Sequence, residues 1–141
     1  MNPEFWGPSG WKFLHSITFY YPKQPTSEDK MRYGDFFRLL QYTLPCERCA
    51  HHYGQNLKKY SLEKGLESRE NLIKWLIDIH NDVNKDNKKR IYTYQEVIDM
   101  YKSEMNEING ILSILTFVQI LIVIIIFYLF AKGILQINYR S

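Results

Sequence analysis

Apolar positions in the first part of the chain recur every three or four residues, which is the period of an α-helix. The first run begins after Ser9 and ends at Tyr21, because the proline that follows disfavours the helical conformation at the residue before it. A second run follows a cap at Thr26 or Ser27 and extends to about Thr43. No run alternates polar and apolar residues one by one, so the pattern predicts helices and no sheet.

Three more helices are expected before the apolar C-terminal part. Pro45 suits the first turn of a helix that ends near Leu57. Ser68 is expected to cap a longer helix, which gives way to a basic loop at residues 84–90. Thr93–Glu96 has the form of a capping box and opens a fifth helix. The predicted fold class is therefore all-α, a bundle of four to five helices.

The hydrophobic pattern changes at residues 111–131, which carry no charged side chain. At 1.5 Å per residue, a helix of this length spans the roughly 30 Å hydrocarbon core of a membrane. The sequence thus predicts a globular domain at residues 1–105, a junction at 106–110, a single transmembrane helix at 111–131 and a short tail at 132–141. The helix would anchor the domain to a membrane.

Composition adds limits to this picture. The 141 residues suit one domain with an appendage, and a net charge of +3 with interspersed signs gives no reason to expect a nucleic-acid partner. Aromatic residues reach 16%, which suits either a compact core or a flat-walled pocket. The first residues do not form a basic and apolar leader, so the domain is expected to stay on the cytosolic side.

Candidate chemistry centres on Cys46 and Cys49, the only two cysteines. Their spacing of three places both on one side of a helix, close enough to form a disulfide. At a helix start, the unpaired backbone N–H groups and the positive end of the helix dipole favour a thiolate. The pair could therefore be a redox dithiol, part of a zinc site, or two thiols without a role.

Zinc is the less favoured of the two functional readings. Cys46, Cys49 and His52 supply three ligands at close spacing. A fourth ligand would have to be His15, His51 or His80. Structural zinc sites are usually built from two such ligand pairs, and the second is missing here. A thioredoxin-like fold is also disfavoured, because that fold needs a βαβ pattern around its cysteines.

Two other blocks suggest what the dithiol reacts with. Trp11 and His15 lie four residues apart, as do His80 and Asn84, so each pair shares a helix face. Basic side chains follow the second block at Lys85, Lys88, Lys89 and Arg90. Each block alone suits a helix core or cap. Together they offer an aromatic wall, hydrogen-bonding groups and cations, which suit an aromatic dinucleotide held among helices.

At this point the chain resembles the Erv/ALR family of FAD-linked sulfhydryl oxidases. The resemblance rests on four blocks in the family's order: WGPSGWKFLH at 6–15, YYPKQPT at 20–26, LPCERCAHHY at 44–53 and WLIDIHNDVNKDNKK at 75–89. It covers residues 6 to about 101. The short chain and its segment IYTYQEVIDMY particularly resemble members from large cytoplasmic DNA viruses.

The resemblance implies a helical bundle, usually a homodimer, with FAD beside the cysteine pair. It implies that Cys49 is the sulfur next to the flavin and that Cys46 meets the substrate. By position, the residues implied to line the cofactor are Trp11, His15, Tyr21, His52, His80, Asn81, Val83, Asn84, Lys88, Lys89 and Tyr94. Tyr94 stands where the family often has a tryptophan.

The chain also departs from the family pattern. Pro8 and Ser9 stand in the region where many members carry an arginine, and there is no third cysteine to act as a shuttle. A separate thiol-bearing protein, thioredoxin-like or another dithiol protein, is therefore expected to reduce Cys46 directly. The resemblance implies that the electrons pass through FAD to dioxygen and form hydrogen peroxide. The alternative is a membrane-anchored zinc-binding adaptor using Cys46, Cys49 and His52.

The side of the membrane is predicted from charge. Lys88, Lys89, Arg90 and Lys102 precede the apolar segment, and Lys132 and Arg140 follow it. The positive-inside tendency then places the catalytic domain in the cytosol. A disulfide-forming enzyme would work there against a reducing thiol pool. That setting favours a viral assembly pathway, in the host cytoplasm or at a virion membrane.

Overall fold

The computed structural model describes residues 1–140, except for the side chains of Met105 and of residues 134–140. The only regular secondary structure in the described chain is helical, with no strand, which confirms the all-α prediction. The six helices are α1 (Pro3–Tyr20), α2 (Ser27–Thr43), α3 (Glu47–Lys59), α4 (Leu62–Gly65), α5 (Arg69–Asp86) and α6 (Tyr94–Arg140). Residues 1–94 form one compact unit, and the chain from Gln95 onward forms another.

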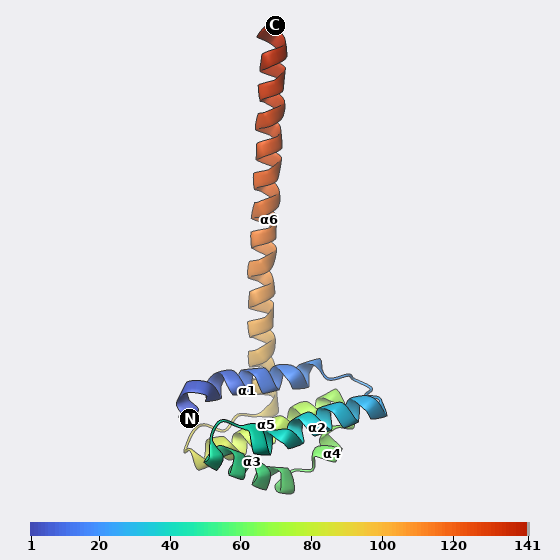
Figure 1. Cartoon of the computed structure of the whole chain (residues 1–141), viewed down its shortest axis with the longest axis vertical. Helices are drawn as coiled ribbons and strands as arrows, with labels where there is room; N and C mark the ends of the chain where they lie inside the picture. The colour runs from blue at the N-terminus through green and yellow to red at the C-terminus, as the bar shows by residue number, and fades with distance from the viewer. Residues whose placement is uncertain (141) are drawn as a thin grey trace. The chain divides into compact units, whose positions relative to one another are not determined.

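The core of the first unit lies around α5, which packs against α1, α3 and α4, while α2 packs against α3 (Figure 1). Leu72, Leu76 and Ile79 of α5 are fully buried. Phe37 of α2 meets Trp75 edge-to-face, with ring centroids 5.0 Å apart. This arrangement buries the apolar face of α5 in the centre of the domain.

The first helix starts earlier than expected. Asn2 caps α1 by accepting a 3.0 Å hydrogen bond from the Glu4 amide, and Pro3 occupies the first helical position. Pro8 lies inside α1, so the prediction of a start after Ser9 was wrong. Proline near a helix start removes one backbone hydrogen bond without ending the helix when the neighbouring turns remain intact.

The second helix begins as predicted. The Thr26 hydroxyl accepts a 3.2 Å hydrogen bond from the Asp29 amide, and the Asp29 carboxylate accepts a 2.9 Å bond from the Thr26 amide. This reciprocal capping box fixes the start of α2 at Ser27. The third helix differs by one position: Cys46 is its N-cap and Pro45 lies outside it, rather than in the first turn.

The link between α3 and α5 is more ordered than the sequence indicated. Ser61 caps the four-residue helix α4, which was not predicted. Lys59, at the end of α3, donates 2.8 and 2.7 Å hydrogen bonds to the two carboxylate oxygens of Asp82 on α5. The Trp75 indole donates a 3.1 Å bond to the Tyr60 carbonyl. These contacts fasten the C-terminal end of α3 to α5.

The end of α5 also lies beyond the predicted helix. Residues 84–86 belong to α5 rather than to a loop. Lys88 follows with a φ of 54°, and the Lys89 amide donates a 2.8 Å bond back to the Asn84 carbonyl. This is a Schellman ending, in which glycine usually takes the left-handed position that Lys88 occupies here. The backbone thus turns sharply where the basic residues gather.

In the second unit, α6 is continuous through residues 106–110. Its segment from Tyr94 to Gly133 contains an apolar stretch long enough, by length and composition, to cross a membrane, and no part of that stretch is buried within the chain. Of the expected tail at 132–141, Ser141 and the side chains of residues 134–140 lie outside the described part of the structure.

Candidate functional site

Cys46 and Cys49 are joined by a disulfide at the start of α3, with Cα atoms 5.1 Å apart. Cys46 is the N-cap, and its sulfur accepts a 3.2 Å hydrogen bond from the Cys49 amide. Both cysteines are half-buried, while the intervening Glu47 and Arg48 are exposed. A thiolate formed at Cys46 would keep this N–H donor and the positive end of the α3 dipole, so the local structure favours thiol–disulfide exchange.

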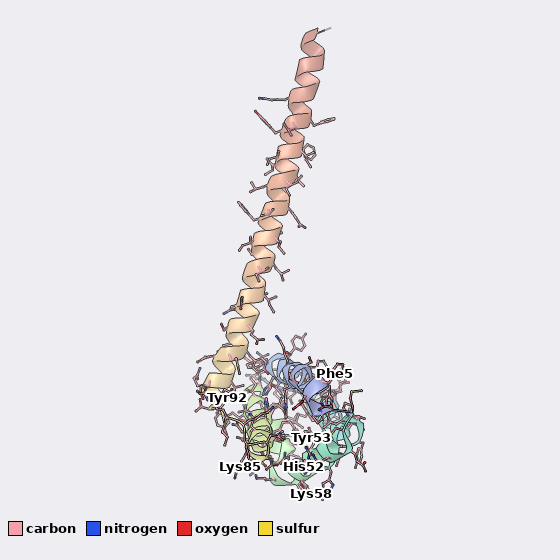
Figure 2. All side chains as sticks on the ribbon, turned by 90° about the vertical axis from the view of Figure 1, so that its left-hand side faces the viewer. Phe5, His52, Tyr53, Lys58, Lys85 and Tyr92 are labelled. Atoms are coloured by element: carbon pink, nitrogen blue, oxygen red, sulfur yellow. A yellow bond between two sulfur atoms is a disulfide. The ribbon has the colours of Figure 1, made fainter. Side chains whose placement is uncertain are left out.

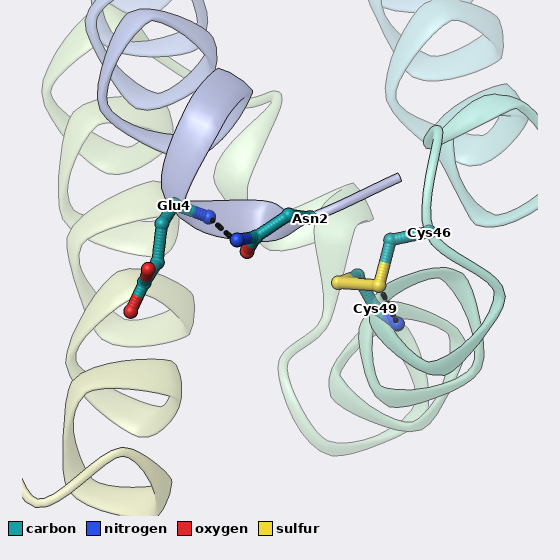
Figure 3. The surroundings of a disulfide bond; sticks show 4 residues. All are labelled: Asn2, Glu4, Cys46 and Cys49. Carbon is teal, nitrogen blue, oxygen red and sulfur yellow. Dashed lines mark hydrogen bonds between the residues drawn. A yellow bond between two sulfur atoms is a disulfide. The ribbon is translucent and has the colours of Figure 1, made fainter.

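The first turn of α1 lies beside this disulfide. Figure 3 shows Asn2, with its hydrogen bond to Glu4, next to the two sulfur atoms. The disulfide is therefore flanked by two chain segments that are distant in sequence, the start of α1 and the start of α3.

A second cluster joins α1 to α5. The rings of Trp11 and His80 are stacked, with centroids 3.9 Å apart and planes within 6° of parallel. His15 is fully buried, and its Nε2 lies 3.1 Å from Nδ1 of His80, so one imidazole donates a hydrogen bond to the other. The sequence placed Trp11 with His15 and His80 with Asn84; the structure brings Trp11, His15 and His80 together.

Both imidazoles of this cluster are neutral at physiological pH. Burial, and then the neighbouring His80, lower the pKa of His15 from 6.5 to about 3. Burial, and then the charge of Lys89, lower the pKa of His80 from 6.5 to about 4. A neutral pair can keep its hydrogen bond and stay stacked on Trp11, which a pair of imidazolium ions could not do without repulsion.

These shifts predict a domain that weakens in acid. Unfolding returns each imidazole to a pKa near 6.5, so the unfolded chain binds more protons than the folded one below that pH. The free energy of unfolding should therefore fall as the pH drops from 6.5 to 4, by on the order of 3 kcal/mol for each histidine. Urea unfolding of the parent and of His80→Gln measures this. The variant should show a shallower slope, and equal slopes would contradict the assignment.

The other candidate residues near the end of α5 differ in burial and in hydrogen bonding. The Asn81 side-chain amide donates a 2.8 Å hydrogen bond to the Tyr92 carbonyl and accepts a 3.0 Å bond from the Tyr92 amide. Asn84 is buried, Val83 is half-buried, and Lys88 and Lys89 are exposed. Both ends of the Asn81 amide thus hold the segment that follows α5, whereas the buried Asn84 lies one turn after His80.

Tyr94 is anchored outside the stack. Its hydroxyl donates a 2.7 Å hydrogen bond to the Asp78 carboxylate. This hydrogen bond, together with burial, raises the pKa of Tyr94 to about 12. Neither Asp78 nor Tyr92 was singled out from the sequence. Asp78 is a charged residue between the apolar residues Ile77 and Ile79, two positions before His80. That unusual position is the one sequence feature that could have drawn attention to it.

Two expected pocket residues lie elsewhere. Tyr21 is fully buried in the core, and its hydroxyl donates a 2.8 Å hydrogen bond to the Leu66 carbonyl. It is ten residues beyond Trp11, which corresponds to about 15 Å along a helix. His52 is exposed, next to His51 (Figure 2). The structure does not bring these two side chains into the Trp11 stack.

Two surface hollows lie away from the cysteines. One, of about 450 Å³, is lined by Phe13, Ser16, Ile17, Tyr20, Arg32, Tyr33 and Phe36 of α1 and α2. The other, of about 570 Å³, lies around Tyr60 and Trp75, between the end of α3 and α5. Neither is lined by the disulfide or by the Trp11 stack.

Zinc is not supported. Among the residues that the structure describes, no group of three or more histidine, cysteine, aspartate or glutamate side chains is placed to hold a metal ion. Cys46 and Cys49 are bonded to each other, so neither can provide a thiolate ligand in this state.

Comparison with known proteins identifies the class. The family model described as the Erv1 / Alr family matches residues 8–102. A probable FAD-linked sulfhydryl oxidase of Acanthamoeba polyphaga mimivirus is 50% identical over 100 residues, which cover 70% of each chain. The mitochondrial FAD-linked sulfhydryl oxidase of Saccharomyces cerevisiae is 38% identical over 85 residues, covering 59% of this chain and 43% of that protein.

Solved structures of the same family have a similar fold. The FAD binding domain of Erv1 from Saccharomyces cerevisiae matches with a TM-score of 0.68 and 31% identity, covering 73% of this chain and 96% of that one. The matching relatives are FAD-linked sulfhydryl oxidases, and the fold agrees with that class. The chain belongs to the Erv1/Alr family. The predictions of the family, of the enzyme class and of FAD as its cofactor are thereby confirmed.

Proposed function

We propose that this protein is an FAD-dependent thiol oxidase that forms disulfides in a partner protein through Cys46 and Cys49, with dioxygen as the final acceptor and hydrogen peroxide as the product. The observation that carries the proposal is the Cys46–Cys49 disulfide at the start of α3, in a chain of the Erv1/Alr family. The chain spans less than half of the yeast relative, so the substrate and the acceptor are argued from its own residues.

The dithiol reaction follows from the geometry of α3. A partner thiolate attacks the sulfur of Cys46, the Cys46–Cys49 bond breaks, and Cys49 leaves as a thiolate. The partner's second thiolate then attacks its own first sulfur, which releases Cys46 as a thiolate. The Cys49 amide stabilises that second leaving group through its 3.2 Å hydrogen bond to Cys46. The partner has lost two electrons and two protons, and the cysteine pair has gained the electrons.

The residues around Trp11 fit the aromatic cofactor. Trp11 and His80 offer stacked planes, and Asn84 offers a buried amide. The Trp6 indole N–H is buried without a hydrogen-bond partner among the described residues, which is a costly state for a donor that nothing binds. Lys88 and Lys89 supply cations for phosphates. When bound, FAD supplies the electron acceptor for the reduced cysteine pair and the route to dioxygen.

Within this proposal the implied lining residues take different roles. Trp11, His15, His80, Asn84, Lys88 and Lys89 are proposed to contact or orient the cofactor. Asn81 positions the segment after α5, and Tyr94 is held by Asp78 at its edge. Val83, half-buried on α5, remains a proposed contact. Tyr21 and His52 lie outside the stack, Tyr21 in the core and His52 on the surface.

The purified full chain in detergent tests the proposal. It should be yellow, show a flavin absorbance spectrum and contain no stoichiometric metal. Addition of dithiothreitol should consume oxygen and produce hydrogen peroxide. A colourless protein carrying zinc would overturn the proposal in favour of an adaptor.

The proposed homodimer would use the face formed by α1 and α2. Phe13 and Tyr20 line the hollow of about 450 Å³ and are 60% and 82% exposed, an unusual exposure for aromatic side chains. Phe13→Glu places two carboxylates across the symmetric contact, so the dimer should dissociate at least about a hundredfold more readily. Light scattering measures the mass, with Met31→Glu as the control. A parent that is monomeric, or a variant that stays dimeric, would rule out this face.

Membrane attachment through α6 is the remaining part of the proposal. Residues 111–131 would cross the membrane, with the domain at residues 1–105 in the cytosol and the junction at 106–110 next to the surface. Support comes from the long apolar stretch of α6 and from the mimivirus relative, which suggests the host cytoplasm or a virion membrane. Labelling of reduced Cys46 by an impermeant thiol reagent in vesicles of known orientation would settle the side.

A further inference from the structure

Large apolar side chains are exposed around the disulfide. Leu39 and Tyr42, one turn apart in the last part of α2, are 56% and 77% exposed. Phe5, in the first turns of α1, is 81% exposed. Single exposed apolar residues are ordinary on a protein surface. These three come from two helices whose adjoining ends flank one reactive bond.

Tyr42 lies within the area that a partner protein has to cover, and Leu39 and Phe5 lie at or near its edge. Tyr42 precedes Cys46 by four residues, so their Cα atoms are at most about 14 Å apart. Leu39 lies about 4.5 Å further along the helix axis. Figure 3 shows the first turn of α1 beside the disulfide, and Figure 2 shows Phe5 at that end of the domain. A standard interface buries about 800 Å² on each partner, a disc of roughly 16 Å radius.

Charge gives the surface little preference of its own. Glu47 and Arg48 lie between the two cysteines, are both exposed, and carry opposite signs. Their fields largely cancel at the distance of an approaching protein. With Glu4 of α1 also exposed beside the disulfide, the nearest charges carry only a small acidic excess, so long-range steering is weak at this point. Apolar contact is the main source of recognition that these exposed side chains offer.

We propose that Phe5, Leu39 and Tyr42 form a substrate-docking patch for a reduced protein whose reactive cysteine pair is flanked by apolar side chains. The inference rests on the proposed thiol oxidase function, because direct sulfur-to-sulfur contact with Cys46 forces the partner onto this surface. Attack of the partner's thiolate forms its bond to Cys46 and breaks the Cys46–Cys49 bond, and Cys49 takes the electron pair. The patch holds the partner during this step and during its resolution.

The test follows disulfide exchange in the full chain, in detergent with its cofactor and without oxygen. The probes are dithiothreitol and two reduced peptides of equal length and charge with the same Cys-x-x-Cys centre. One peptide carries leucine and phenylalanine beside the cysteines, and the other carries serine. Rates come from acid quenching, alkylation and mass measurement of Cys46. The variants are Leu39→Ser with Tyr42→Ser, Phe5→Ser alone, and the control Met31→Ser, which is 57% exposed at the far end of α2.

In the double variant, exchange with the apolar peptide should slow about tenfold, since two apolar side chains lose their burial against the partner. Phe5→Ser should slow the same peptide in the same direction. Exchange with the serine peptide and with dithiothreitol should be unchanged, and Met31→Ser should match the parent for all three probes. Because Phe5 lies on a different helix, its variant keeps the test valid if the double variant unfolds.

Three results would overturn the patch. The first two are an unchanged exchange rate with the apolar peptide, and an equal fall in rate for all three probes. The third is a change of oligomeric state in the Tyr42 variant, which would make this face a contact between copies. The proposed oxidase can fail separately. If the peptides discriminate as expected but the parent then consumes no oxygen, the patch stands and the oxidase does not. If the parent oxidises dithiols without distinguishing the peptides, the oxidase stands and the patch does not.

Discussion

Cys49→Ser is expected to abolish dithiol-dependent oxygen consumption and to leave the chain yellow. Without the Cys49 thiol, the Cys46 sulfur has no intramolecular disulfide partner, so a substrate dithiol finds no bond to exchange with. The cofactor should remain, because the stack of Trp11 on His80 does not involve α3. An oxygen electrode and the flavin absorbance of the same sample measure both parts of the prediction.

Glu47, one of the two residues between the cysteines, provides the matched control. Glu47 is exposed and belongs to the same turn of α3. Glu47→Gln should therefore keep turnover near the parental rate. Undiminished oxidation by Cys49→Ser would show that the proposed route through the cysteine pair is wrong. Loss of the yellow colour in that variant would show that the disulfide supports the cofactor site.

Trp11→Ala is expected to weaken FAD binding and release the cofactor during purification. Stacking of an aromatic side chain on a base contributes about 1–3 kcal/mol. The affinity for FAD should therefore fall by about 10- to 100-fold. Equilibrium dialysis, or the ratio of flavin to protein absorbance after gel filtration, measures the loss. The Cys46–Cys49 disulfide, counted by mass with and without reduction, should be unaffected.

Phe5→Ala is the control for this second change. Phe5 lies on the same helix but is 81% exposed, and it makes no stacking contact with His80. The control should retain FAD as the parent does. If Trp11→Ala retains FAD equally well, the stacked cluster is part of the core packing and the cofactor lies elsewhere on the bundle.

The helices could be predicted wherever local chemistry decides the backbone. Thr26 and Asp29 form their capping box from four consecutive residues, and Ser68 caps α5 through its own hydroxyl. Neither depends on the rest of the fold. The start of α1 was missed, because Pro8 suggested a boundary while Asn2 and Pro3 form a complete helix start before it.

The site was predictable only in part. Trp11, His15, His80 and Asn84 carry helical spacing that places each pair on one face, and α1 and α5 then pack together. Asn81 has the same local signals as its neighbours, yet the Tyr92 backbone binds both ends of its amide. That contact joins residues eleven positions apart, across a turn whose shape depends on Lys88 adopting a positive φ. No spacing rule describes such a turn.

The attachment of α3 has a mechanical consequence for catalysis. Its C-terminal end is fastened to α5 by Lys59–Asp82 and Trp75–Tyr60, and its middle is held by the Tyr53 hydroxyl, which donates a 3.0 Å bond to the Phe37 carbonyl. The helix is 13 residues long, about 20 Å from end to end. The cysteine pair lies at the opposite end of α3, with Cys49 one turn before Tyr53, whose ring belongs to the buried core. A bound partner therefore meets a cysteine pair that the core holds in a fixed position.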